Sequence, residues 1–388
     1  MKIGFIGNIT PPVGGAEVLL NRFLTGFGAR RHSSCLVRWR RQVFIYFPER
    51  VVRVYAPRGT VLRRGNLSVH YLFETIERDR YERRADFGQR IKEQYKQQGL
   101  VAARIFERSG SELIHAHMLF PNLFFGATAA KALGLPFVAT IHGMLEFRIL
   151  EFFRKKYPGF AKLVDQAFRQ ADVVVAVSDE IAQECRRRGA RRVVMISGGV
   201  DAQTFRPEKK RSRQPQDIVF VGSVRQDKGA SILIQAFERL NGQLPGNLVF
   251  AGKRLIQGPV YERAKRNRKI RFLGVQKASE IRKVIHQARM VVLPSASEGL
   301  PISMLEAMAC ETPVLVTRTG QVPKLIRNKK NGFLIDQRTP KGLAQQIQEV
   351  ASRTDLKQIG RRARKTALEF DIRSVVRQYE SLYHGLLS

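Results

Sequence analysis

The sequence predicts an α/β protein of two domains, each built on a parallel sheet with helical crossovers. Short β-branched runs alternate with amphipathic helical patterns, an alternation typical of parallel strands joined by helices. The alternation occurs twice, on either side of a polar segment bracketed by prolines at Arg206–Pro215. The chain has 388 residues, 44% of them apolar and 26% charged. This length and composition suit two globular domains, each with a buried core.

The predicted strands form two series. The first comprises Lys2–Gly7, Arg50–Tyr55, Leu113–His117, Pro136–Ile141 and Asp172–Val177. The second comprises Asp217–Gly222, Asn247–Gly252, Lys269–Gly274, Met290–Pro294, Pro313–Thr317 and Gly332–Ile335. The prolines of the intervening segment cannot continue a helix or a central strand, so we expect a linker at 206–215 between domains 1–205 and 216–370. A capping-type aspartate and apolar residues at helical spacing predict a last helix over Asp371–Leu387, in the terminal segment 371–388.

Composition limits the compartment and the partners. The chain carries 68 Lys and Arg against 33 Asp and Glu, a net charge of +35. This excess indicates a polyanion nearby, which nucleic acid, anionic lipid or a phosphorylated acceptor fits equally well. The clusters at Arg38–Arg41 and Arg186–Arg188 are each expected on a solvated face. Three widely spaced cysteines suit no disulfide framework, and no apolar run is long enough for a signal peptide or a membrane span, so we expect a cytoplasmic protein.

Two loops at predicted strand ends are candidates for phosphate binding. Gly14 and Gly15 follow the first strand and open a helix, where backbone amides can approach an anion. In the second series, Ser223, Arg225 and Lys228 lie on a glycine-bounded loop between a strand and a helix. The two cations there are suited to neutralise a diphosphate. The alternatives are a plain tight turn for the first loop and surface cations for the second.

Three histidines follow two neighbouring predicted strands. His115 and His117 close one strand, and His142 follows the next. Open α/β sheets bind ligands at the carboxyl ends of their strands, so these side chains are candidates for a binding site. A zinc site is disfavoured because no acidic or cysteine ligand stands nearby at metal spacing. For His115 we expect a buried, hydrogen-bonded structural role.

The strongest chemical signal is a pair of glutamates around the start of one helix. Glu298 lies in the turn after a buried strand, Pro301 suits the first helical position, and Glu306 falls inside an otherwise apolar helix. A carboxylate accepts two hydrogen bonds from a vicinal diol, so Glu298 is suited to a hexose and Glu306 to a ribose. The amides of Gly299 and Leu300 can face the hexose or a diphosphate. The alternative is a surface acid and a core ion pair.

Together these motifs resemble family 4 of the retaining glycosyltransferases, across essentially the whole chain. The matching pieces, in the family's order, are Gly14–Glu17, His115–His117, Thr140–Gly143, Val177–Ser178, Gly199–Asp201, Lys228–Gly229, Glu298–Glu306 and Asn331–Phe333. The resemblance implies the GT-B fold, with two Rossmann-like domains facing each other across a cleft. It implies that the N-terminal domain binds acceptor, the C-terminal domain binds nucleotide-sugar, and the last helix crosses back onto the first domain.

The resemblance also implies roles for individual residues. It assigns Gly15 to the donor phosphate, His142 to the transferred sugar, Lys228 to the diphosphate, Glu298 to the sugar and Glu306 to the ribose. The expected catalytic residues are His142, Lys228 and Glu298. The expected donor site contains Gly14, Gly15, Ser223, Arg225, Lys228, Glu298, Gly299, Leu300, Pro301 and Glu306.

The chain departs from the family pattern at two positions. Ser223 stands where the family usually has an arginine, for which Arg225 is the possible substitute. Lys324 replaces the acid of the family's Gly-Gly-x-Pro-Glu. The sequence contains no Asp-x-Asp, the usual metal-diphosphate ligand of the other large glycosyltransferase fold. We therefore expect transfer without metal or cofactor, with cations and helix N-termini supplying the positive charge.

The function expected is retaining transfer of a hexose from a UDP-, GDP- or ADP-sugar to a glycan or lipid-linked acceptor, in cell-surface polysaccharide or glycolipid synthesis. Apolar residues are mixed with basic ones over Met144–Phe160, which favours peripheral contact with anionic membrane. An ordinary interdomain or core-facing helix is the alternative there. Three other functions stay open: a non-catalytic GT-B partner subunit, an enzyme acting on a small phosphorylated sugar, and a nucleic-acid-binding protein. The last is suggested by charge alone, since no nucleic-acid-binding motif is present.

Overall fold

The computed structural model describes residues 1–6, 24, 33–39, 61–64, 67–72, 87–119, 121–144, 146–148, 150–151, 158–208 and 216–388. These residues form two compact units. The first contains the described residues up to Ile196 together with Val376–Ser388, and the second contains Ser197–Val375. The predicted strand at Arg50–Tyr55, both glycines of the Gly14–Gly15 pair and most of the predicted linker lie outside the described residues.

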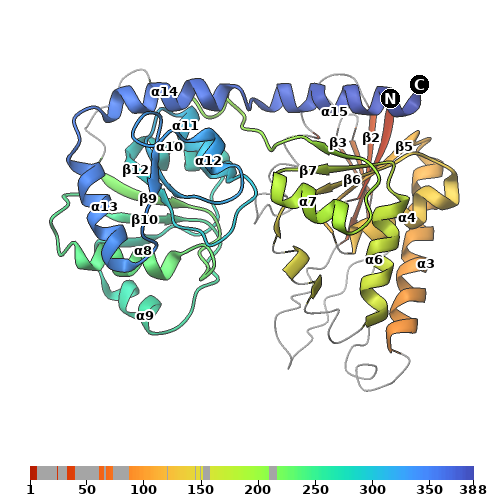
Figure 1. Ribbon diagram of the computed structural model, residues 1–388, viewed down its shortest axis with the longest axis horizontal. Coiled ribbons are helices and arrows are strands. Elements are labelled where there is room, and N and C mark those ends of the chain that lie inside the picture. The colour runs from red at the N-terminus through yellow and green to blue at the C-terminus, as the bar shows by residue number, and fades with distance from the viewer. Residues whose placement is uncertain are drawn as a thin grey trace. The chain divides into compact units, whose positions relative to one another are not determined.

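The first unit is built on an eight-stranded sheet in the order β3-β4-β2-β1-β5-β6-β7-β8 (Figure 1). Its strands are β1 (Lys2–Ile6), β2 (Ser33–Trp39), β3 (Val61–Arg64), β4 (Leu67–Leu72), β5 (Leu113–His117), β6 (Phe137–Ile141), β7 (Val173–Ala176) and β8 (Val193–Met195). All neighbouring pairs are parallel except β3 and β4, which are antiparallel. The two residues between β3 and β4 are too few for a parallel crossover.

Four of these strands are not predicted by the sequence. β3 and β8 are short, with four and three residues, and β4 has six. β2 ends within the basic cluster that we expected on a solvated face. The backbone of Arg38 pairs with that of Tyr71, so this part of the cluster belongs to an interior strand. Pairing with β1 and β4 on both sides, a long-range effect, sets the strand there despite the charged residue.

The helices of the first unit are α3 (Phe87–Arg108), α4 (Asn122–Leu133), α6 (Pro158–Gln170) and α7 (Asp179–Arg187). α3, α4 and α6 pack against one another. The start of α7 is encoded locally, because Ser178 Oγ accepts a hydrogen bond from the Ile181 N–H and two acids occupy the first turn. None of the described helices is both long and apolar enough to cross a membrane.

One part of the segment predicted to contact lipid faces the protein interior instead. Phe147 and Leu150 are each 2% exposed and belong to the core of the first unit. Phe147 stacks on Phe168 with ring centroids 6.2 Å apart. Because both side chains are buried in the protein core, the expectation that they face a membrane is wrong.

The second unit contains a six-stranded, all-parallel sheet in the order β11-β10-β9-β12-β13-β14. Its strands are β9 (Asp217–Val221), β10 (Leu248–Ala251), β11 (Ile270–Phe272), β12 (Ala288–Leu293), β13 (Val314–Thr317) and β14 (Phe333–Ile335). All six lie where the sequence predicts strands. Buried apolar side chains fill them nearly without alternation, as expected for a parallel sheet covered on both faces.

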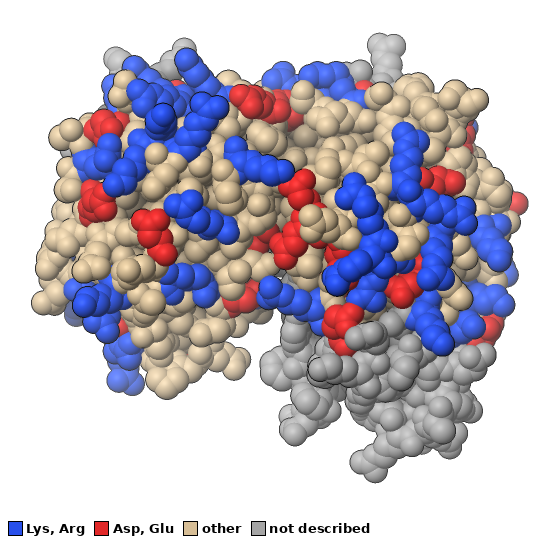
Figure 2. All heavy atoms as spheres, viewed as in Figure 1, with Lys and Arg blue, Asp and Glu red and all other residues tan. Residues whose placement is uncertain are grey.

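Helices cover both faces of this sheet (Figure 1). One group comprises α8 (Ala230–Arg239), α9 (Pro259–Arg266) and α13 (Pro340–Ser352), and the other α10 (Ala278–Gln287), α11 (Ile302–Ala309) and α14 (Leu356–Leu368). The short α12 (Val322–Leu325) precedes β14. α14 carries five cations and no acid, and Figure 2 shows Lys and Arg side chains gathered over it.

The boundary between the units lies earlier than the sequence predicts. Ser197–Phe205, expected in the first domain, belong to the second unit. Val200 and Phe205 are fully buried in the second core, and the ring nitrogen Nε2 of His286 lies 2.8 Å from the Arg206 carbonyl. These contacts hold the segment on the second unit before the proline-bracketed linker begins.

The last helix, α15 (Ile372–Leu387), confirms the prediction that the chain returns to the first domain. Asp371 Oδ1 accepts a hydrogen bond from the Arg373 N–H at 2.9 Å and so caps the helix start. From Val376 onward the helix belongs to the first unit, where Tyr379 and Tyr383 are buried. The fold is therefore two α/β units with a shared terminal helix.

Candidate active site

The loop between β9 and α8 lies against the end of β12. Gly229 has a φ of 77°, and a Cβ there would lie 2.1 Å from the carbonyl oxygen of Pro294. Only glycine allows this approach. The Ala296 N–H donates a hydrogen bond to the Asp227 carbonyl at 2.8 Å, which joins the two loops through their backbones. The two predicted donor-binding motifs of the second unit are thus neighbours.

This approach brings Lys228 to Glu298. Lys228 Nζ lies 2.8 Å from Glu298 Oε1, with the two side chains 26% and 18% exposed. Ser295 Oγ donates to the same oxygen at 2.8 Å. No described residue donates a hydrogen bond to Glu298 Oε2. One carboxylate oxygen is therefore held by the protein, while the other is available to a ligand hydroxyl.

The second predicted cation, Arg225, is held by its own loop. Its Nε donates to Asp227 Oδ1 at 2.8 Å and its Nη2 to the other oxygen, a bidentate pair. Burial by itself raises the pKa of Asp227, but the hydrogen bonds and charge of Arg225, with the charge of Lys228, outweigh it and lower that pKa. Ser223 lies half-buried on the same loop. Sequence reasoning missed Asp227, although an Arg-x-Asp in a turn is a visible signal for such a pair.

The loop that carries Glu298 is clamped from the neighbouring strand. Thr317 Oγ1 donates to the Ser295 carbonyl at 2.7 Å, and the Gln321 N–H donates to the Gly299 carbonyl at 2.8 Å. Gly320 has a φ of 51°, and a Cβ there would lie 2.1 Å from the Gly299 oxygen. Neither Ser295 nor the clamp is predicted from the sequence, because these contacts join segments that are distant in the chain.

The start of α11 presents unused amides next to Glu298. No described residue accepts a hydrogen bond from the N–H groups of Gly299 or Leu300. Pro301 is the N-cap, with an extended ψ of 108°, instead of the first helical residue that its sequence position suggested. A helix N-terminus carries partial positive charge and open donors, so it suits a phosphate or sugar oxygen. Glu306 lies farther along α11 and is 6% exposed.

In the first unit, His115 has the structural role predicted for it. It is fully buried, with Nδ1 2.6 Å from the Tyr383 hydroxyl and Nε2 2.8 Å from Thr140 Oγ1. Tyr379 OH lies 3.0 Å from the same threonine oxygen. Burial, and then the nearby His142, keep the pKa of His115 well below its usual value. This neutral network fixes α15 to strands β5 and β6.

His142 is linked to His117. His117 Nδ1 lies 3.0 Å from His142 Nε2, and the two rings stack at an interplanar angle of 18°. Burial lowers the pKa of His142 to about 4, so the ring is neutral at neutral pH. Glu146 Oε1 accepts a hydrogen bond from the His142 N–H at 3.3 Å, a contact that the sequence did not suggest. Among the described residues, no group of three or more His, Cys, Asp or Glu side chains is arranged to hold a metal ion.

The structure thus groups the predicted residues by unit. Ser223, Arg225, Lys228, Glu298, Gly299, Leu300, Pro301 and Glu306 lie in the second unit, on the two loops and on α11. His142 lies in the first unit. Gly14 and Gly15 lie outside the described residues. The second unit therefore contains a carboxylate, a lysine and helix amides that can together hold a sugar attached to a phosphate.

Two family models and several known proteins match this chain. Residues 13–204 match the family described as Glycosyltransferase Family 4, and residues 201–366 match Glycosyl transferases group 1. An uncharacterized glycosyltransferase of Methanocaldococcus jannaschii is 26% identical over 293 residues, 74% of this chain and 79% of that one. An Escherichia coli protein named for colanic acid biosynthesis is 26% identical over 284 residues, 67% and 68% of the two chains.

A solved structure shows the same fold. The Anabaena protein HepE, crystallised with UDP and glucose, aligns with a TM-score of 0.73 and 19% identity over 100% of both chains. At this identity the likeness shows the GT-B fold alone. Because the two family matches together run from residue 13 to residue 366, the chain belongs to the glycosyltransferases that these models describe, family 4 in its N-terminal half and group 1 in its C-terminal half.

Proposed function

We propose that this glycosyltransferase moves a hexose from a nucleotide-sugar with retention of configuration and without a metal ion. The observation that carries the proposal is the pairing of Lys228 with one oxygen of Glu298, beside the open amides of Gly299 and Leu300. The remaining carboxylate oxygen is suited to a hexose hydroxyl, and the lysine and amides to a diphosphate. Among the nucleotides that remain possible, UDP is favoured by the similar Anabaena fold, whose crystals hold UDP and glucose.

In this proposal the protein acts by positioning and charge stabilisation. The acceptor hydroxyl attacks from the face that the diphosphate leaves, and the departing phosphate takes the acceptor proton, so retention needs no side-chain nucleophile. Lys228 and the N-terminus of α11 stabilise the negative charge that develops on the leaving diphosphate. Glu306 binds the ribose diol, and neutral His142 exchanges a hydrogen bond with a sugar hydroxyl. No step is assigned to a metal or other cofactor.

For the acceptor we propose a glycan or lipid-linked glycan at the cytoplasmic face of a membrane, in cell-surface polysaccharide synthesis. The similarity to a protein named for colanic acid biosynthesis supports the polysaccharide. Anionic lipid is one of the polyanions that the charge of +35 fits.

The test is a transfer assay with a panel of UDP-, GDP- and ADP-sugars in the presence of EDTA. Glu298→Gln removes the charge that holds Lys228 and the sugar, and Glu306→Gln removes the ribose contact while conserving shape. Each is expected to slow turnover by about 100-fold or more. Glu262→Gln, an exposed acid of α9, is the matched control and should stay within about twofold of wild type.

Three outcomes would contradict the proposal at different points. A product with inverted anomeric configuration, detected by NMR, would contradict retention. Loss of turnover in EDTA would contradict metal independence. Failure of every donor to bind the wild-type protein would favour the non-catalytic partner subunit over an enzyme.

A further inference from the structure

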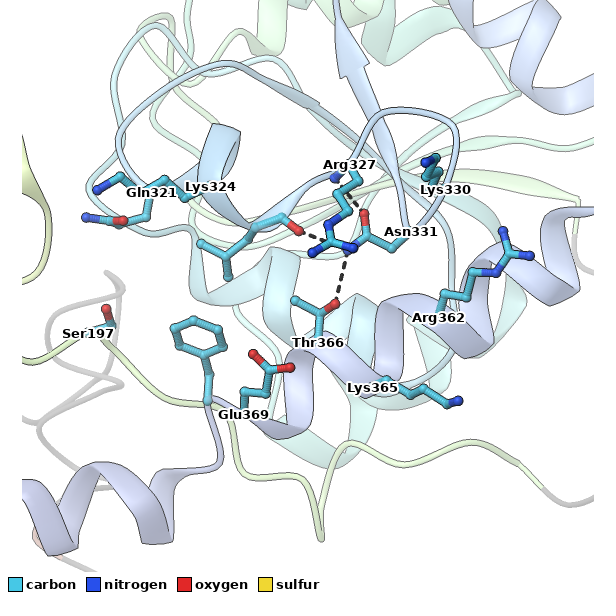
Figure 3. Close-up of a pocket in the computed structure, with 12 residues that line it drawn as sticks. Ser197, Gln321, Lys324, Arg327, Lys330, Asn331, Arg362, Lys365, Thr366 and Glu369 are labelled. Carbon is cyan, nitrogen blue, oxygen red and sulfur yellow. Dashed lines mark hydrogen bonds between the residues drawn. The ribbon is translucent and has the colours of Figure 1, made fainter.

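The second unit contains a pocket whose lining includes no residue of the Lys228 or Glu298 loop. Its volume is about 500 Å³, which lies in the range of small-molecule sites. Figure 3 shows it between helix α14 and the segment 321–331. All twelve lining residues belong to the second unit, and none is among the predicted donor-binding residues.

The pocket concentrates positive charge. Its charged lining residues are Lys324, Arg327, Lys330, Arg362, Lys365 and Glu369. Five cations and one carboxylate leave a formal charge of +4. Arg327, Lys330, Arg362 and Lys365 form no salt bridge with any carboxylate in the described part of the chain. Cations gathered around one cavity without acidic partners attract an anion.

A buried asparagine fixes the two walls of the pocket to each other. Asn331 is 7% exposed, and its Oδ1 accepts a hydrogen bond from the Arg327 N–H at 2.7 Å. Its Nδ2 donates to the Leu325 carbonyl at 2.9 Å and to Thr366 Oγ1 on α14 at 3.0 Å (Figure 3). The backbone of the loop that carries Arg327 and Lys330 is therefore attached to the helix, so the loop itself needs little ordering when a ligand binds.

The helical wall presents its polar residues on one face. Arg362, Lys365, Thr366 and Glu369 follow the i, i+3, i+4, i+7 spacing of a single helix face. The opposite face, with Ala363 and Ala367, is fully buried in the core. Guanidinium, ammonium and hydroxyl donors around one cavity are the groups that bind phosphate oxygens.

We propose that this pocket binds the phosphate of a second ligand, a phosphomonoester or diphosphate other than the sugar donor. Lys324, where the family pattern has an acid, contributes one of the five charges. The same chemistry would recognise a soluble phosphate ester or a lipid-linked phosphate. The inference does not depend on the reaction proposed above.

The test measures binding of inorganic pyrophosphate by titration calorimetry at low salt. Arg362→Gln/Lys365→Gln removes two cations from the pocket and is expected to weaken binding about tenfold. Lys357→Gln/Arg361→Gln removes the same charge from α14 outside the pocket and should change binding less than twofold. Lys228→Met removes the donor-loop cation and should leave pocket binding in place. Thermal melts verify that each variant is folded.

A second arm separates the possible sources of the phosphate. Co-sedimentation is measured with phosphatidylcholine vesicles that contain or lack phosphatidic acid. The site is supported if, among the variants, only Arg362→Gln/Lys365→Gln loses binding in either measurement. Loss in the calorimetry identifies a soluble phosphate as the ligand, and loss in the co-sedimentation identifies a lipid phosphate. The inference is overturned if the wild-type protein binds in neither arm, if the Lys357/Arg361 variant loses as much as the pocket variant, or if only Lys228→Met reduces pyrophosphate binding.

Discussion

Removal of the Tyr383 hydroxyl should destabilise the first unit by a measurable amount. Tyr383 and His115 are both fully buried, and their hydroxyl and Nδ1 lie 2.6 Å apart. Burial raises the pKa of Tyr383 and lowers that of His115, so both groups are neutral. In Tyr383→Phe, the imidazole nitrogen loses this partner without access to water. A buried polar group left in this state costs about 1–3 kcal/mol.

The assay is urea unfolding followed by the fluorescence of Trp39. It is the chain's one tryptophan and lies on β2, so its signal reports the first unit. With a urea m value of roughly 2–3 kcal/mol/M, a loss of about 1–3 kcal/mol should lower the midpoint by about 0.3–1.5 M. Following one unit through one probe avoids treating a two-unit chain as a single two-state system.

The control is Gln378→Ala, an exposed position on the same helix, which should change the free energy of unfolding by less than about 0.5 kcal/mol. A Tyr383→Phe midpoint equal to that of the control would refute the view that the His115 network holds α15 on the first unit. A lower midpoint for both variants would point to general helix destabilisation instead.

Three further predictions concern the donor loops and the histidines. Gly320→Ala should destabilise the second unit by about 2 kcal/mol or more in thermal melts, because the new methyl group meets the Gly299 oxygen. The control Gly242→Ala has a positive φ but open space around the new methyl group, so it should destabilise the unit by about 1 kcal/mol in the same thermal melts. Ser295→Ala should lower kcat about tenfold, since Glu298 loses a positioning hydrogen bond, and Ser295→Thr should restore part of it; equal rates for all three proteins would contradict this. Below pH 6.5 an unfolded histidine gains a proton, whereas His142 in the folded chain does so only near pH 4. The free energy of unfolding should therefore fall as the pH drops from about 6.5 to about 4, less steeply in His142→Gln, and identical wild-type and variant profiles would count against burial of this ring.

Much of the second unit is predictable because its signals are local. All six strands carry apolar runs, and the helix over Ile302–Ala309 begins next to a proline. The first unit is harder to predict from the sequence. Its β2 contains Arg38 and is a strand only because β1 and β4 pair with it. The sequence also predicts the boundary between the units too late in the chain. Val200 and Phe205 belong to the second unit because they are buried in its core, and that contact is not visible in the local sequence.

By itself, the sequence determined the two α/β units, the terminal helix and the chemical types in the donor motif, because periodicity and short motifs depend on residues close in the chain. The return of that helix to the first domain was implied by the family resemblance alone. The tertiary structure decided which groups meet. Lys228 binds Glu298 because Gly229 admits the Pro294 carbonyl, and Arg225 is held by Asp227. The cationic pocket likewise exists because Asn331 joins its loop to α14. Such contacts arise from packing between distant segments, which sequence spacing does not specify.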